Sequence, residues 1–237
     1  MTKTPTRYYA VGDIHGRADL LTLLHKTITL DAKEHDGEVK IVYLGDYIDR
    51  GPQSCEVLDI LVGKSPIENA ERIFLMGNHE CDLIQFLEAP KTQEDWLHKW
   101  GGASTLQSYS VPYTPARDTQ AMANQLLEVM PEKHAEFLDS LALYFQAGNF
   151  LFVHGGVRPN IPLEQQEEED LLYIKKDFTD NPQHGLPYKI IYGHTIHDSP
   201  VHTEDRIGVD TGAYLGGPLT AAVLEGDTVR FLQARMN

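Results

Sequence analysis

The chain has 237 residues, and 41% of them are hydrophobic, which is enough for one large domain with an apolar core. Its formal net charge of −15 argues against a surface that binds the phosphates of nucleic acids. No apolar stretch reaches about 18 residues, and no basic start precedes a long apolar segment, so neither a membrane partner nor a secretory signal is predicted. The two cysteines make no disulfide or metal framework, which is typical of a cytoplasmic protein.

Three strand–turn–helix units open the chain, and each turn contains glycine. The first unit is strand 8–11, turn 12–16 and helix 17–30; the second is strand 39–44, turn 45–52 and helix 53–62, with Pro52 opening the helix; the third is strand 72–76, turn 77–80 and helix 81–87. This repetition predicts a layered α/β fold, in which ligands gather beyond the carboxyl ends of the strands.

The second half of the chain is predicted to add a helical insertion and more strands. Residues 91–131 contain two tryptophans and a helical stretch near 120–130, but no strand, so we interpret them as an insertion within a single domain spanning residues 1–237. The later predicted elements are helix 132–141, strands 142–147 and 150–153 with a hairpin turn at 148–149, strand 189–192, and β-like runs around 207, 219–224 and 228–232. The acidic run 164–170 is expected to be an exposed loop or a helix start.

Polar side chains that can bind metal follow five of the predicted strands. They are Asp13 and His15, then Asp46, Asn78, His154 and His194. Oxygen and nitrogen ligands without thiolate suit manganese, iron or zinc better than copper(I) or calcium. Six such groups exceed the needs of one tetrahedral ion, so the sequence predicts two divalent ions that share a bridging carboxylate. The ions leave the site cationic by about two charges, which attracts a phosphate ester.

The turn 45–52 adds groups that can act on a phosphate ester. Arg50 offers a planar fork that binds phosphoryl oxygens through two hydrogen bonds. Two ions roughly 3.5–4 Å apart can hold a hydroxide between them, so hydrolysis by direct water attack needs no protein nucleophile. The leaving oxygen needs a general acid, and His79 is the candidate, with Asp49 orienting its ring and keeping it protonated.

Each motif alone has a structural explanation. A single histidine at a strand end is more often hydrogen-bonded or exposed than a metal ligand, and a Gly-Asn-His sequence by itself is a turn. Five such clusters at five predicted strand ends favour a functional site.

The same five segments resemble the signature of a known family. Together, Gly12-Asp13-Ile14-His15-Gly16, 45–51, 77–80, 154–156 and 193–195 resemble the motifs of calcineurin-like metallophosphoesterases. The Asp49-Arg50 pair and the Asn78-His79-Glu80 sequence resemble the phosphoprotein phosphatase branch, in particular small bacterial and phage serine/threonine phosphatases. The resemblance extends over roughly residues 8 to 224.

This resemblance implies an α/β metallophosphoesterase fold, in which a central β-sandwich of mixed sheets is flanked by helices. The implied metal ligands form two sets that share one carboxylate: Asp13, His15 and Asp46 for one ion, and Asp46, Asn78, His154 and His194 for the other. It also implies that His79 and Asp49 are the acid pair and that Arg50 binds phosphate. Manganese is the usual activating metal of the bacterial members, and iron and zinc are the other candidates.

The chain departs from the family pattern in residues 171–178. Relatives often carry a tryptophan and a second phosphate-binding arginine there, whereas this segment reads Leu-Leu-Tyr-Ile-Lys-Lys-Asp-Phe. Lys175 either takes the place of that arginine, as a point charge without the bidentate fork, or is a surface residue. The predicted substrate contacts are therefore Arg50, Asn78 and Lys175.

We therefore expect a metal-dependent phosphomonoester hydrolase that acts on phosphoserine or phosphothreonine in proteins and on small phosphate esters. The alternative is symmetrical cleavage of dinucleoside polyphosphates such as diadenosine tetraphosphate by the same centre; the Asp49-Arg50 pair favours the first activity. A third hypothesis is a non-catalytic module that binds metal or phosphate, but such a module has no need of the His79–Asp49 acid pair.

Overall fold

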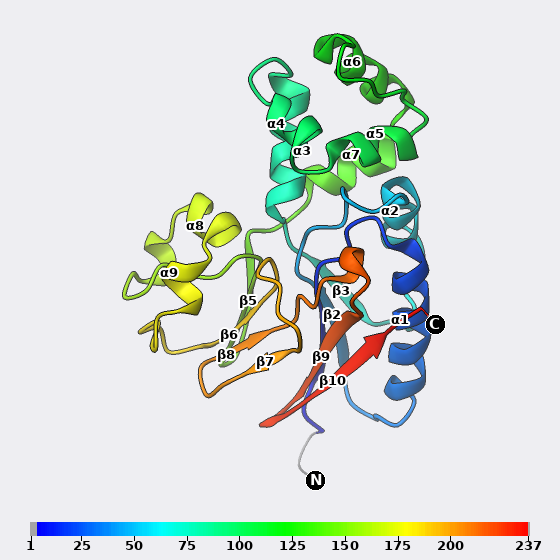
Figure 1. Ribbon diagram of the computed structural model, residues 1–237. Helices are drawn as coiled ribbons and strands as arrows, with labels where there is room; N and C mark the ends of the chain where they lie inside the picture. The colour runs from blue at the N-terminus through cyan, green and yellow to red at the C-terminus, as the bar shows by residue number, and fades with distance from the viewer. Residues whose placement is uncertain (1–3, 237) are drawn as a thin grey trace.

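Residues 4–236, which the computed structural model describes, form two five-stranded sheets with helices on both outer faces (Figure 1). The first sheet has the order β10-β9-β1-β2-β3, with β1 (Arg7–Val11), β2 (Val39–Tyr43), β3 (Glu71–Phe74), β9 (Leu219–Glu225) and β10 (Thr228–Ala234). The second has the order β4-β5-β6-β8-β7, with β4 (Tyr144–Ala147), β5 (Phe150–Val153), β6 (Lys189–Tyr192), β7 (Val201–His202) and β8 (Arg206–Gly208). The predicted α/β fold with two mixed sheets is confirmed.

Each sheet contains three neighbouring parallel strands. β1, β2 and β3 run parallel to one another, and so do β5, β6 and β8, whereas β9, β10, β4 and β7 are antiparallel to their neighbours. The carboxyl ends of neighbouring parallel strands therefore meet at one edge of each sheet. The loops predicted to carry the metal ligands begin at these ends.

Alternating side chains of the first sheet enter two different cores. Tyr9 and Val11 of β1 pack with the helices of the outer face, whereas Ala10 faces the second sheet. Val42 of β2 and Phe152 of β5 belong to the same buried cluster as Ala10. Both faces of these strands are thus covered, which explains why the sequence shows continuous apolar runs there.

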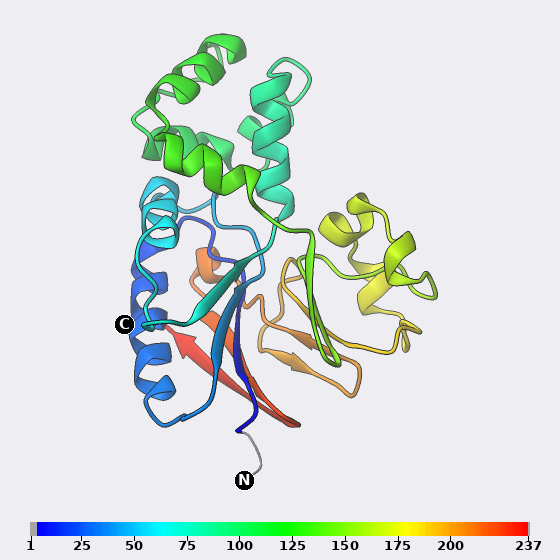
Figure 2. The same cartoon turned by 180° about the vertical axis from the view of Figure 1, so that it is seen from behind.

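Helices cover the two outer faces unequally (Figures 1 and 2). The first sheet is covered by α1 (Ala18–Ala32), whose Leu20, Leu21 and Leu24 are buried, and by α2 (Ser54–Val62). The second sheet carries the short helices α8 (Glu168–Tyr173) and α9 (Lys176–Thr179), which pack over a smaller cluster.

Between β3 and β4 the chain is helical, as predicted for residues 91–131. This part contains α3 (Asn78–Glu88), α4 (Glu94–His98), α5 (Gly102–Ser108), α6 (Thr119–Val129) and α7 (Glu132–Asp139). These helices stand at the end of the sandwich where the metal-ligand loops emerge (Figure 1). Trp96 and Leu106 of the insertion share one hydrophobic cluster with Tyr47 and Ile48 of the central turn, so the insertion packs directly on the predicted active-site loop.

The predicted starts of α2 and α3 were shifted, and the short helix α9 was missed. α2 begins at Ser54, so Pro52 lies in the turn before it, where the next residue, Gln53, donates its backbone N–H to Gly16 O at 3.0 Å. α3 begins at Asn78 because Glu80 accepts the Gly77 N–H at 3.0 Å and caps the helix. Asn78 and His79 therefore occupy a helical turn instead of the loop that we predicted. α9 was not predicted, since it has too few residues to show helical periodicity.

The acidic run 164–170 and the two cysteines lie in the following settings. Residues 163–165 form a 3-10 turn and α8 begins at Glu168, so the acidic run includes a helix start, and all its glutamates are exposed. Cys55 and Cys81 are both free thiols. Within residues 4–236, no helix combines the length and hydrophobicity needed to cross a bilayer.

Candidate metal centre

The loops after β1, β2, β5 and β6 meet the start of α3 at one end of the sandwich. Five of the six predicted ligands are buried there, and the sixth, His194, is half-buried; the five are Asp13, His15, Asp46, Asn78 and His154. The second-sheet loops meet the first-sheet loops directly, since His154 Nε2 lies 3.1 Å from Asn78 Oδ1 and the His194 backbone N–H donates to both oxygens of Asp13 at 3.0–3.1 Å. The structure therefore brings all six residues together.

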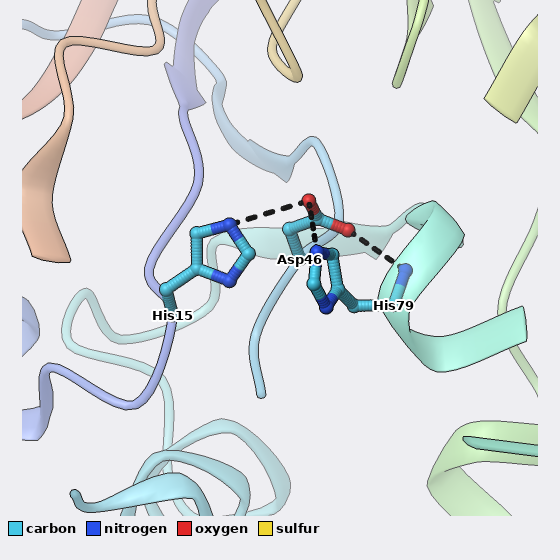
Figure 3. Close-up of side chains that lie close together, drawn as sticks. All are labelled: His15, Asp46 and His79. Atoms are coloured by element: carbon cyan, nitrogen blue, oxygen red, sulfur yellow. Dashed lines mark hydrogen bonds and ion pairs between the residues drawn. The ribbon is translucent and has the colours of Figure 1, made fainter. Parts of the chain in front are cut away.

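The Asp46 carboxylate lies between two groups of nitrogen donors. Its Oδ2 is 3.4 Å from His15 Nε2 and 4.0 Å from His79 Nε2 (Figure 3). Its Oδ1 is 3.4 Å from His154 Nε2, and His194 completes that second group. In each group the possible ligand atoms lie within 4.8 Å of one another. Each oxygen of Asp46 thus faces a separate group of histidine nitrogens, an arrangement in which one carboxylate could bridge two ions.

The histidines have the tautomer and charge that metal binding needs. His15 Nδ1 lies 2.9 Å from the Ile48 carbonyl and His154 Nδ1 lies 2.8 Å from the Leu44 carbonyl, so each Nδ1–H is donated to the backbone and each Nε2 lone pair faces the centre. Burial lowers the pKa of His154, and it lowers the pKa values of both His15 and His194 to about 3. Neutral imidazole is the metal-binding form.

An unsatisfied nitrogen also points to a missing ligand. Among the described residues, His194 Nε2 is buried and has no hydrogen-bond partner. A buried polar atom without a partner is costly unless an ion or water completes it. Together with the orientation of His15 and His154, this orphaned nitrogen shows that the residues fit a metal centre.

Three buried carboxylates surround the same point. Asp13, Asp46 and Asp210 are each at most 3% exposed. Burial, followed by the charges of Asp210 and Asp46, raises the pKa of Asp13 well above its usual range. Uncompensated carboxylates in such a place are strongly unfavourable, and divalent cations would compensate them. Asp13 belongs to neither of the two compact groups. In the group that contains His15 and Asp46, the third member is His79 instead of the expected Asp13.

Asp210 was missed by the sequence analysis. It follows β8, which is a parallel neighbour of β6, so it lies at a sixth strand end of the same kind. Burial raises its pKa to about 6. The rule that identified the other ligands would have found Asp210 if the weak β-like run around Ile207 had been treated as a strand of that sheet.

His79 and Asp49, the two residues predicted to act as the acid pair, are in direct contact. His79 Nδ1 lies 2.7 Å from Asp49 Oδ2, and Asp49 is fully buried. Burial opposes the charged ring, but the carboxylates of Asp46 and Asp49 outweigh it and raise the pKa of His79 to about 9. His79 is therefore protonated at neutral pH, in contrast to His15 and His154.

Two residues of the insertion hold Asp49 in place, and the sequence analysis assigned them no role. Trp96 Nε1 donates to Asp49 Oδ2 at 2.7 Å, and Thr105 Oγ1 donates to Asp49 Oδ1 at 2.6 Å. The Asp49 backbone N–H in turn donates to Thr105 Oγ1 at 2.9 Å and to Ser54 Oγ at 3.1 Å. The insertion thus fixes the carboxylate that orients His79.

Glu80 joins the loop that carries Asp46 to the start of α3, which carries Asn78. It is fully buried and accepts backbone N–H groups of Asp46 and Tyr47 at 2.8 Å and of Gly77 at 3.0 Å. Burial, together with the Asp46 charge, raises the pKa of Glu80 to about 8. Glu80 lies three residues after Gly77, and this spacing in the sequence is typical of a residue that caps a helix.

A cavity of about 430 Å³ lies over these groups. It is lined by the predicted substrate contacts Arg50, Asn78 and Lys175, and by the aromatic rings of Trp100, Tyr173 and Tyr214 among other residues. The Arg50 guanidinium is exposed and lies 5.5 Å from the centre of the Tyr214 ring. Burial, followed by the neighbouring His154, lowers the pKa of His194, and Lys175 and His194 line the same cavity.

Comparison with known proteins agrees with this geometry. A family model described as calcineurin-like phosphoesterase matches residues 6–224. An asymmetrical bis(5'-nucleosyl)-tetraphosphatase, PrpE, of Anoxybacillus flavithermus is 24% identical over 233 residues, which cover 90% of this chain and 89% of the relative.

Two solved phosphatase structures share the fold. The cold-active protein-tyrosine phosphatase of a psychrophilic Shewanella species matches with a TM-score of 0.61 at 17% identity, covering 99% of this chain and 83% of that chain. A protein serine/threonine phosphatase from Saccharomyces cerevisiae matches with a TM-score of 0.55 at 17% identity, covering 99% of this chain and 81% of that chain. Since the family model spans nearly the whole chain, this protein belongs to the calcineurin-like phosphoesterase family and is a hydrolase of the phosphatase type.

Proposed function

We propose that this protein is a phosphomonoesterase that requires two divalent ions and acts on phosphoserine or phosphothreonine in proteins. The observation that carries the proposal is the 2.7 Å contact between His79 and Asp49 beside Arg50, in a cavity above Asp46. When bound, two divalent ions supply charge neutralisation and an activated water molecule for attack on phosphorus. The donor set suits manganese, our proposed metal, and also iron or zinc.

The ligand sets follow from the two faces of Asp46. His15 and Asp46 Oδ2, with Asp13, are proposed to hold one ion. Asp46 Oδ1, with Asn78, His154 and His194, is proposed to hold the other. The backbone carbonyls that accept from His15 and His154 keep both rings in the ligating tautomer.

His79 is proposed to donate a proton to the leaving oxygen. Its raised pKa keeps the proton on the ring at neutral pH, and Asp49 fixes Nδ1, so Nε2 is the nitrogen that faces the centre, 4.0 Å from Asp46 Oδ2. Arg50 binds phosphoryl oxygens through its planar fork, and Lys175 adds a second positive charge. The amide of Asn78, which lines the same cavity, is the third predicted contact of the phosphoryl group.

The charges around the cavity favour a substrate with a single phosphoryl group. Apart from histidines, the cationic side chains among the described residues that line it are Arg50 and Lys175, whereas Asp46, Asp82 and Asp210 supply carboxylates. A tetraphosphate chain carries more negative charge than a single phosphate ester. One guanidinium and one ammonium match one phosphate ester.

A second candidate function is hydrolysis of dinucleoside tetraphosphates. The curated relatives that span about nine-tenths of this chain are named for that activity. The rings of Trp100, Tyr173 and Tyr214 line the cavity and offer faces on which a purine could stack. Our sequence analysis considered symmetrical cleavage, whereas these relatives are named as asymmetrical enzymes.

Turnover of two substrate types by one manganese-loaded preparation tests the proposal. We expect a higher kcat/KM for a phosphoserine or phosphothreonine peptide than for diadenosine tetraphosphate. A large preference for the dinucleotide contradicts the proposal, and its products then distinguish asymmetrical cleavage to ATP and AMP from symmetrical cleavage to two ADP. Absence of turnover with two ions bound supports a non-catalytic module instead.

A further inference from the structure

A hydrogen bond outside the predicted metal centre joins two elements that border the cavity. The Tyr173 hydroxyl, at the end of α8, donates to Asp82 Oδ1 of α3 at 2.6 Å. Both residues line the cavity, and Asp82 is 3% exposed. Asp82 Oδ2 is buried without a hydrogen-bond partner among the described residues. The hydrogen bond from Tyr173 to Oδ1 is therefore the main polar contact of this carboxylate.

The same half of α8 is also attached to a loop of the second sheet. The Gly155 N–H donates to the Leu171 carbonyl at 2.7 Å, and Gly155 directly follows His154. A Cβ at Gly155 would approach the Leu172 carbonyl to 2.9 Å, so this approach of α8 to the loop requires glycine. α8 is thus held at Gly155 on one side of the cavity and at Asp82 on the other.

Lys175 follows Tyr173 by two residues and directly precedes α9. Its side chain is exposed and lines the cavity. A lysine side chain is flexible and carries a point charge, so the position of its backbone decides whether the ammonium group reaches a bound phosphoryl group. The contact between Tyr173 and Asp82 sets that position relative to α3, which also carries Asn78 and His79.

We propose that the Tyr173–Asp82 hydrogen bond positions Lys175 and thereby sets the affinity of the site for the phosphoryl group. The inference rests on the proposed function, because it assigns a substrate-binding effect. Tyr173 and Asp82 are positioning residues that act through Lys175. α8 and α3 come from segments that are about 90 residues apart, so this bond connects the two halves of the cavity.

The Tyr173→Phe variant of the manganese-loaded protein tests this role, because it removes the hydroxyl and keeps the ring. We expect KM for 4-nitrophenyl phosphate and the inhibition constant for inorganic phosphate to rise together by about tenfold, the scale of one hydrogen bond to a charged group. The kcat value and the metal content should stay within about twofold of wild type. Asp82→Leu, which removes the acceptor, should give the same pattern.

Three matched variants separate positioning from a general structural effect. Asp82→Asn keeps an oxygen that can accept from Tyr173, and should restore KM to near the wild-type value. Tyr144→Phe changes an exposed tyrosine on β4 and should have no effect. In a Lys175→Ala background, Tyr173→Phe should have no further effect on KM, because the group that it positions is gone.

The outcomes distinguish this inference from the proposed function. An unchanged KM in Tyr173→Phe, or an undiminished effect in the Lys175→Ala background, overturns the positioning role even if the enzyme is fully active. If the wild-type protein hydrolyses no phosphate ester, the proposed function fails, and calorimetric binding of inorganic phosphate to the same variants still decides the role of Tyr173.

Discussion

Five residues at the candidate site that are not glycine have a left-handed backbone. Their φ angles are 44° at His15, 52° at Asp46, 69° at Asp49, 67° at Arg50 and 57° at His194. Such angles are uncommon for L-residues and persist where surrounding contacts hold them, often at functional sites. Glu80 supplies such contacts through its bonds to the backbone of Asp46 and Tyr47.

The glycines of the motifs serve mainly to allow close approach. A Cβ at Gly77 would collide with the Asp46 carboxylate, and a Cβ at Gly193 would collide with Asp13 Oδ1. Gly16, Gly45 and Gly156 of these motifs also have positive φ angles of their own. At the ligands themselves, the unusual angles belong to the functional residues, and neighbouring glycines leave room for their carboxylates.

Replacing the proposed acid tests its role at the residue scale. His79→Asn should bind the same amount of metal as wild type, because His79 is not one of the proposed ligands. Its kcat should fall by about 10² or more, the scale of general acid catalysis. Metal analysis and turnover of the same preparation measure both quantities, and unchanged turnover would remove His79 from the mechanism.

The charge state of His79 can be observed without turnover. In the chelator-treated protein, the ring should keep its proton until the pH rises through about 9, and Asp49→Asn should move that titration toward the ordinary value of about 6.5. Since the folded-state pKa is raised, the pair stabilises the fold fully below about pH 6.5 and loses this contribution as the pH rises to about 9. NMR titration of the His79 imidazole measures this pKa. A value near 6.5 in the wild-type protein contradicts the assigned pair.

At the scale of elements, the strand-end rule explains which parts of the site could be predicted. Local sequence patterns marked β1, β2, β3, β5 and β6, and polar residues at their carboxyl ends were brought together by the parallel arrangement. Asp210 was missed because β8 is only three residues long and shows little pattern. Trp96 and Thr105 were missed because they reach Asp49 from 47 and 56 residues away, and no local pattern encodes such contacts.

The insertion should affect stability through Asp49. Thr105→Val removes the hydroxyl that contacts the buried Asp49 carboxylate while keeping the shape of the side chain. We expect the free energy of unfolding to fall by about 1–3 kcal/mol, the effect of leaving a buried acceptor unsatisfied. Denaturant unfolding measures the change, and Thr114→Val, at an exposed threonine of the same insertion, is the matched control. Equal stability of both variants contradicts a structural role for the Thr105 bond.

At the scale of the whole molecule, the candidate centre lies where the two sheets meet. Loops of the first sheet and the start of α3 supply Asp13, His15, Asp46 and Asn78, and loops of the second sheet supply His154 and His194. Ions bound there would connect both halves of the sandwich. The layered architecture could be predicted from βα repetition, whereas the sandwich of two mixed sheets was implied only by the family resemblance, because the shared core depends on contacts distant in sequence.

Metal binding should therefore stabilise the whole fold. A ligand at 100 times its Kd adds about 2.7 kcal/mol to the free energy of unfolding when it binds only the folded state. We expect manganese to raise the Tm of the chelator-treated protein and the chelator to lower it again. His154→Ala should reduce this shift, since it removes a ligand from the second sheet. An identical Tm with and without manganese contradicts metal binding between the sheets.

The number of ions bound per chain tests the central claim most directly. Elemental analysis of the manganese-loaded protein, after removal of free metal, should give two ions per chain for wild type. Asp46→Asn should lose most of both, because each oxygen of Asp46 faces one of the two ligand groups. Fewer than two ions in wild type, or two ions retained in Asp46→Asn, contradicts a centre of two ions bridged by this carboxylate.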